Sequence, residues 1–159
     1  MSLRAVLPFL ALVALGCGSG SPCGPTSAKV TNAVDGDTID LENGLRLRLL
    51  LVDTPETTKG KNDCYGQQAA AYTTDNLVGH VVSLKYDTQC MDRYGRTLAY
   101  VSVDNRDFNA ELISKGYACV DYIAPDGMAR HQEFVDLESV AKTNRTGLWG
   151  VCNPVTCVH

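Results

Sequence analysis

The chain has 159 residues, of which 45% are hydrophobic. This length fits one domain with a real hydrophobic core. The formal net charge of −4 excludes nucleic-acid binding through a globally basic surface, because non-specific backbone affinity comes from Lys and Arg. Any anionic partner must therefore be bound by local positive charge.

The N-terminal residues have the pattern of an export signal. Arg4 supplies a positive charge, and the run of about 11 residues from Ala5 to Leu15 is apolar apart from Pro8. Such a run is too short to span a bilayer but fits the apolar core of a signal peptide. A buried N-terminal helix is the alternative, and the flexible Gly- and Ser-rich segment that follows argues against it. The expected boundaries are a signal peptide over 1–16, a flexible tether over 17–27 and a folded domain over 28–159.

The string Ala-Leu-Gly-Cys, which ends at Cys17, resembles the lipobox of bacterial lipoproteins, in which the cysteine is lipidated. Ala14 stands where such motifs usually carry Leu, so simple secretion after nearby cleavage stays open. Acyl chains on Cys17 would anchor the protein to a membrane without a spanning helix. We therefore expect an exported monomer, either a membrane-anchored lipoprotein or a secreted or periplasmic protein.

Six cysteines follow Cys17, and disulfides are the favoured explanation for them. An even number of cysteines in an exported chain favours disulfides, although the sequence alone allows many pairings. A zinc site is the alternative, but no Cys-x-x-Cys spacing occurs, and His80, His131 and His159 are scattered. The six are Cys23, Cys64, Cys90, Cys119, Cys152 and Cys157.

Strand patterns come first in the predicted domain. Asn43-Gly44 separates two strand-like runs and is a strong hairpin signal. In the second run, Leu45, Leu47 and Leu49 share one face by period-two alternation. The predicted strands in this part are Ala28–Val34, Thr38–Leu41 and Leu45–Val52.

The rest of the domain mixes helices and strands. Predicted helices cover Gly66–Leu77, Phe108–Lys115 and Ala129–Thr143; strands cover Val81–Tyr86 and Leu98–Val103, and Tyr117–Ile123 is an extended stretch. Consecutive hairpins with interspersed helices favour a small β-barrel that carries helices, an α+β or mainly β fold, over a parallel doubly wound sheet.

Two acidic clusters follow predicted strands. Asp35 and Asp37 flank Gly36, a pattern also typical of a plain turn. Asp53 and Glu56 follow the leucine-rich strand, where polar residues could simply end it. Calcium requires hard oxygen donors, and carboxylates on two loops supply them.

A third cluster, Asp92-Arg93-Tyr94-Gly95-Arg96, contains two arginines and a tyrosine. Guanidinium groups match phosphate oxygens in a two-point manner, although a solvated hairpin loop is the plain alternative. Carboxylates for a metal, a further carboxylate at Glu56 and the arginines Arg48 and Arg96 together suit phosphodiester hydrolysis.

The order and spacing of the three clusters resemble the staphylococcal nuclease (thermonuclease) family. The matching strings are Val-Asp-Gly-Asp-Thr at 34–38, Arg-Leu-Leu-Leu-Val-Asp-Thr-Pro-Glu-Thr at 48–57 and Asp-Arg-Tyr-Gly-Arg-Thr-Leu-Ala-Tyr at 92–100. The resemblance covers about residues 28–150. It implies a five-stranded OB-fold barrel with three helices, and calcium-dependent cleavage of DNA and RNA to 3′-phosphate products.

The resemblance also implies roles for single residues. For Ca²⁺ it implies the carboxylates of Asp37 and Asp53, the backbone carbonyl of Thr54, and Asp35 in the outer shell. For catalysis it implies Glu56 as general base with Arg48 and Arg96 on the phosphate, and for nucleotide contacts it implies Arg93, Tyr94 and Tyr122. An OB-fold module that binds single strands without cutting them, or a structural lipoprotein, would be expected to lose some of these residues.

Disulfide pairing follows from the same resemblance. In the resembled fold Cys64 begins the first helix, beside the loop that contains Cys90. We therefore expect Cys64 to pair with Cys90. By similar reasoning the remaining expected pairs are Cys119 with Cys152 and Cys23 with Cys157.

Overall fold

The computed structural model describes residues 21–58 and 60–157. The predicted signal peptide and the predicted lipidation site, Cys17, lie outside the described residues. Of the predicted tether, residues 21–27 are described and lie against the domain: the Tyr86 hydroxyl donates to the Pro25 carbonyl at 2.6 Å. Within the described ranges, no helix has the length and apolar character needed to cross a membrane.

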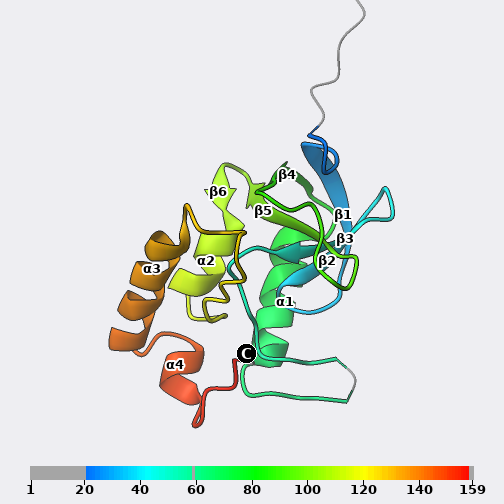
Figure 1. Ribbon diagram of the computed structural model, residues 1–159. Helices are drawn as coiled ribbons and strands as arrows, with labels where there is room; N and C mark the ends of the chain where they lie inside the picture. Colours follow the sequence, from blue (N-terminus) through cyan, green and yellow to red (C-terminus); the bar gives the residue numbers. More distant parts are fainter. Residues whose placement is uncertain (1–20, 59, 158–159) are drawn as a thin grey trace, which may run out of the picture.

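Five strands of the described chain close into a barrel (Figure 1). Neighbours run antiparallel in the order β3-β2-β1-β4-β5, and β3 closes the barrel by pairing in parallel with β5. In that closing pair, Arg48 lies opposite Leu98. The strands are β1 (Ser27–Ala33), β2 (Thr38–Leu41), β3 (Arg46–Leu49), β4 (Val81–Lys85) and β5 (Thr97–Val103), and a short β6 (Arg106–Asp107) pairs with the end of β5.

Three longer helices pack around this barrel. They are α1 (Gly66–Leu77), α2 (Phe108–Ser114) and α3 (His131–Thr143). A single helical turn, α4 (Leu148–Val151), follows α3 and is not predicted by the sequence pattern. Helices α2, α3 and α4 lie together on one side of the barrel (Figure 1). The predicted five-stranded OB-fold barrel with three helices is confirmed.

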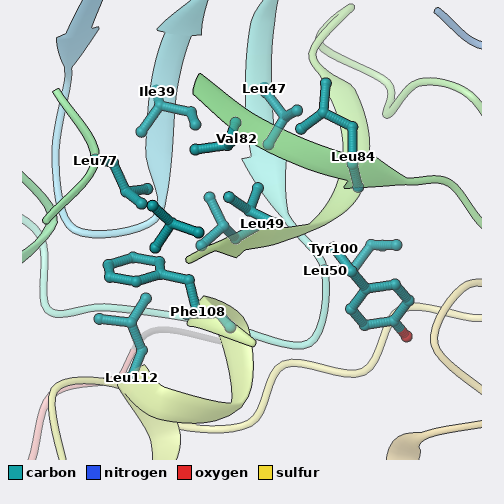
Figure 2. Packing of buried hydrophobic residues seen from close by; sticks show 14 of the residues in the cluster. Ile39, Leu47, Leu49, Leu50, Leu77, Val82, Leu84, Tyr100, Phe108 and Leu112 are labelled. Atoms are coloured by element: carbon teal, nitrogen blue, oxygen red, sulfur yellow. The ribbon is translucent and has the colours of Figure 1, made fainter. Parts of the chain in front are cut away.

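Alternating apolar residues of the strands build the core. Figure 2 shows Ile39 of β2, Leu47 and Leu49 of β3 and Val82 of β4 pointing into the barrel. Phe108, at the start of α2, is fully buried beneath them. Burying such side chains typically contributes ~1.5–3 kcal/mol each. The core therefore fixes the barrel on which the polar loops are placed.

The predicted strand Leu45–Val52 is wrong at its C-terminal end, because β3 stops at Leu49. Leu51 has a φ of 61°, which a strand cannot contain. The side-chain amide of Asn109, buried in α2, donates to the Leu50 carbonyl at 2.9 Å and so stabilises this turn. The chain then runs to Asp53, whose backbone pairs with Cys119.

Disulfides are confirmed, but all three expected pairings are wrong. Residues 21–27 run beside β4, because Ser27 pairs with Ser83, and this brings the N-terminal segment near the loop that holds Cys90. The C-terminal end returns to the base of α1 (Figure 1). These terminal segments lie mostly outside the range of the family resemblance, which therefore could not place them. The observed pairs are Cys23–Cys90, Cys64–Cys152 and Cys119–Cys157.

Candidate active site

The two acidic clusters meet at one corner of the barrel. The buried Asp37 carboxylate accepts hydrogen bonds at Oδ2 from the Thr54 N–H, at 2.7 Å, and from the Thr54 hydroxyl, at 2.9 Å. From α1, the Thr73 hydroxyl donates to the Gly36 carbonyl at 2.6 Å. A Cβ at Gly36 would stand 2.6 Å from the Thr54 Cγ2 and 2.9 Å from the Ala69 Cβ, so only glycine fits. We call Asp35, Gly36, Asp37, Arg48, Asp53 and Thr54 the acidic corner.

Arg48 is the central cation of the acidic corner. Its side chain is only 11% exposed, with Nη1 2.8 Å from Asp37 Oδ1 and Nη2 3.1 Å from Asp53 Oδ1. Nη1 also donates to the Val52 carbonyl. Burial lowers the pKa of Arg48, but the neighbouring carboxylates, Asp37 first, outweigh burial and hold that pKa above its ordinary value. Arg48 is therefore firmly charged.

Asp121 is a site residue that the sequence analysis does not identify. Its Oδ2 lies 3.8 Å from Arg48 Nη2. It belongs to the extended stretch after Cys119 and is part of no recognised motif, so only the pairing of Asp53 with Cys119 brings it to the corner. No local sequence signal could have identified it.

Negative charge is in excess in the acidic corner. Burial of the Asp35 carboxyl, followed by repulsion from Asp37, raises the pKa of Asp35 to about 7. Asp35 Oδ1 nevertheless accepts hydrogen bonds from the N–H groups of Asp37, at 3.1 Å, and Thr38, at 2.8 Å. An additional cation would relieve this repulsion.

The oxygen donors of this corner are the candidate ligands for a divalent cation, although Arg48 and Thr54 engage the Asp37 and Asp53 carboxylates in this structure. Among residues 21–58 and 60–157, no three His, Cys, Asp or Glu side chains are grouped closely enough to hold a metal by themselves. An ion would therefore need the two carboxylates Asp37 and Asp53 together with the Thr54 backbone carbonyl and water. Such an all-oxygen set suits calcium.

Glu56 follows the acidic corner in the chain, and the next two residues hold its carboxylate by hydrogen bonds. Its Oε1 accepts hydrogen bonds from the Thr57 N–H at 3.0 Å, the Thr58 N–H at 2.8 Å and the Thr58 hydroxyl at 2.6 Å. Burial raises the pKa of Glu56, but these hydrogen bonds, those from Thr58 first, together outweigh burial and hold the pKa below its ordinary value. Glu56 is therefore ionised at neutral pH and able to accept a proton.

The third cluster forms an exposed loop, residues 87–96, which we call the arginine loop. Arg96 Nε lies 2.7 Å from Asp92 Oδ2, and the Arg96 side chain is 29% exposed. The guanidinium of Arg93 lies over the ring of Tyr94, 4.8 Å from its centroid. The loop thus presents two cations beside an exposed aromatic ring.

The corner, Glu56 and the arginine loop line one cavity of about 450 Å³, the charged cavity. Its walls contain nine of the ten predicted metal, catalytic and substrate residues, namely Asp35, Asp37, Arg48, Asp53, Thr54, Glu56, Arg93, Tyr94 and Arg96. A neighbouring cavity of about 350 Å³ shares Arg48 and Arg96 and is partly walled by Leu49, Leu50 and Leu98. The tenth residue, Tyr122, stacks on His131 with ring centroids 4.5 Å apart, while its neighbours Asp121 and Ile123 line both cavities.

Comparisons with known proteins find a matching family model and several similar proteins. The family model described as staphylococcal nuclease homologue matches residues 46–151. The thermonuclease of Staphylococcus hyicus is 36% identical over 127 residues, which cover 76% of this chain and 74% of that protein. The thermonuclease of Staphylococcus intermedius is 39% identical over 106 residues, 64% and 63% of the two chains. Endonuclease YncB of Bacillus subtilis is 34% identical over 150 residues, 87% and 71% of the two chains.

Proposed function

Because the chain belongs to the staphylococcal nuclease family, we propose that it is a calcium-dependent nuclease that hydrolyses the phosphodiester bonds of DNA and RNA and leaves 3′-phosphate products. The observation that carries this proposal is the charged cavity, which gathers oxygen donors, a carboxylate and arginines within about 450 Å³.

The residues of the acidic corner would hold the metal. Asp37, Asp53 and the Thr54 carbonyl are the proposed ligands, with Asp35 in the outer shell. When bound, calcium supplies positive charge that offsets the phosphate charge. Its arrival would also relieve the repulsion that raises the pKa of Asp35.

The arginines and the glutamate would act on the phosphodiester itself. Arg48 and Arg96 line the charged cavity and are the proposed phosphate-binding arginines. Their guanidinium groups, paired with carboxylates in this structure, would turn towards the phosphate oxygens and stabilise the additional charge of the five-coordinate transition state. Glu56, ionised and at the wall of the same cavity, takes a proton from the attacking water. Arg93 and Tyr94 are exposed beside these groups, and with Tyr122 they are the proposed nucleotide contacts.

The experiment that tests the proposal is incubation of the purified domain with labelled single-stranded DNA and RNA, in calcium or in excess chelator. We expect shortening only with calcium, and products whose 3′ ends become extendable after phosphatase treatment. Retained length with a mobility shift would instead identify a non-catalytic OB-fold binding module. Shortening in chelator would disprove the calcium requirement.

Substitution of Glu56 by Gln tests the assignment of the base. We expect Glu56→Gln to lower kcat by about 10²–10⁴-fold, because proton removal from water is lost, with an unchanged melting temperature. Glu42→Gln is the matched control: Glu42 lies in the β2–β3 turn, where it accepts from the Lys29 N–H, and should cut at the parent rate. Parent activity in Glu56→Gln would show that another group is the base.

We also propose that the protein is exported and lipid-anchored through Cys17. Three disulfides among the six described cysteines support an oxidising compartment. The full-length protein should partition into detergent, and Cys17→Ser should move it to the aqueous phase. Aqueous partition of the unmodified protein would favour simple secretion.

A further inference from the structure

Glu56 receives one hydrogen bond that depends on the identity of a neighbouring side chain. Two of its three donors are backbone N–H groups, which any residue except proline would supply at positions 57 and 58. The third donor is the Thr58 hydroxyl, 2.6 Å from Glu56 Oε1, which only a hydroxyl residue can supply. Hydrogen bonds to a charged acceptor are about twice as strong as neutral ones.

The loop around Thr58 is itself held in place. The Lys61 N–H donates to the Thr58 carbonyl at 3.0 Å. At the foot of the loop, Asp63 and Glu56 bind each other twice: the Asp63 N–H donates to the Glu56 carbonyl at 3.0 Å, and the Glu56 N–H donates to Asp63 Oδ2 at 3.3 Å. The disulfide Cys64–Cys152 follows immediately. Among the described residues of this loop, Thr58 and Glu56 are thus each held by hydrogen bonds to the backbone or side chain of residues that follow.

We propose that Thr58 is a positioning residue for the general base, an inference that rests on the proposed nuclease function. All three donors converge on Oε1, and within the described residues no hydrogen bond is made to Oε2. The hydroxyl thus fixes the rotation of the carboxyl group and presents Oε2 to the water that attacks phosphorus. Orientation of this kind contributes directly to rate, because only an aligned base accepts the proton.

The test compares Thr58→Val, which keeps the shape but removes the hydroxyl, with Thr58→Ser, which keeps the hydroxyl. We expect Thr58→Val to lower kcat about tenfold with KM unchanged, because Thr58 contacts Glu56 and does not line the charged cavity. Thr58→Ser should restore kcat to within about twofold of the parent. Thr143→Val is the matched control, since the exposed Thr143 hydroxyl donates only to the Ser139 carbonyl within α3; its kcat should equal that of the parent.

Three results would overturn the assignment. They are an unchanged kcat in Thr58→Val, a raised KM with unchanged kcat, and a Thr58→Ser variant as slow as Thr58→Val. Near-ultraviolet circular dichroism of each variant reports whether the fold is kept. In Glu56→Gln, addition of Thr58→Val should lower kcat no further, and an additional loss there would assign Thr58 to another task. An inactive parent protein would instead contradict the nuclease proposal, so the two failures are distinguishable.

Discussion

The acidic corner and the arginine loop face the same cavity but are held in place differently. Arg48 is 11% exposed and bound by buried carboxylates, whereas Arg96 is 29% exposed and paired with Asp92 of its own loop. The arginine loop is attached to the rest of the protein by the disulfide Cys23–Cys90 and by two hydrogen bonds to carboxylates. The Gln89 N–H donates to Asp126 at 2.8 Å, and the Gly127 N–H donates to Asp87 at 2.7 Å. The proposed catalytic arginine of the corner, Arg48, is therefore buried against the barrel, whereas that of the loop, Arg96, lies in a segment attached to the barrel surface.

This difference predicts that activity and stability separate in the arginine loop. Arg96→Ala should lower kcat/KM by about 10²–10³-fold, the usual loss when one transition-state donor is removed. Its free energy of unfolding should change by only about 0–1 kcal/mol, because the pair is partly exposed in a surface loop and ion pairs near the surface contribute little. Urea unfolding and DNA hydrolysis measure the two effects. Arg106→Ala, which breaks another exposed pair with Glu111, should leave hydrolysis intact, and a large stability loss in Arg96→Ala would contradict the separation.

Loss of the disulfide Cys23–Cys90 should reduce stability more than activity, which is the opposite of the effect expected for Arg96→Ala. The double variant Cys23→Ser, Cys90→Ser should lower the free energy of unfolding by about 2–4 kcal/mol, because the bond joins residues 67 apart and constrains the unfolded chain. Well below the melting temperature its kcat/KM should fall less than in Arg96→Ala. Reduction of the parent protein with a thiol reagent gives an independent check. A hydrolysis loss as large as that of Arg96→Ala would mean that the loop depends on this bond for its shape.

In the acidic corner, stability and activity should fall together. Gly36→Ala places a methyl group against Thr54 and Ala69, and overpacking of this kind typically costs ~1–3 kcal/mol. The same methyl displaces Thr54 from Asp37, so calcium affinity and hydrolysis should fall as well. Gly44→Ala is the control for hydrolysis: a Cβ there meets open space, but the φ of +84° strains an alanine, so this variant should lose stability and keep full hydrolysis. A Gly36→Ala protein with the stability and activity of the parent would contradict the prediction that both fall together in the acidic corner.

Local features were predictable from the sequence, and long-range ones were not. The bounds of β2 and α1 are those predicted, because an Asn-Gly hairpin signal and a glycine after a helix are local. Nine of the predicted site residues line one cavity, and they lie in three short motifs. The end of β3 was missed because a run of leucines looks the same in a strand and in a turn that the distant Asn109 stabilises. Asp121 and the disulfide pairs depend in the same way on long-range contacts that no spacing reveals.

Closure of the barrel has a further consequence for when the protein can act. The parallel pairing of β3 with β5 sets Leu47 opposite Thr97 and Arg48 opposite Leu98, so Arg48 and Arg96 come to line the same cavity only after two strands far apart in the chain have joined. A chain that has not made this closure does not hold the two arginines at one cavity. Under the proposed function, such an unfolded chain would not cut nucleic acids.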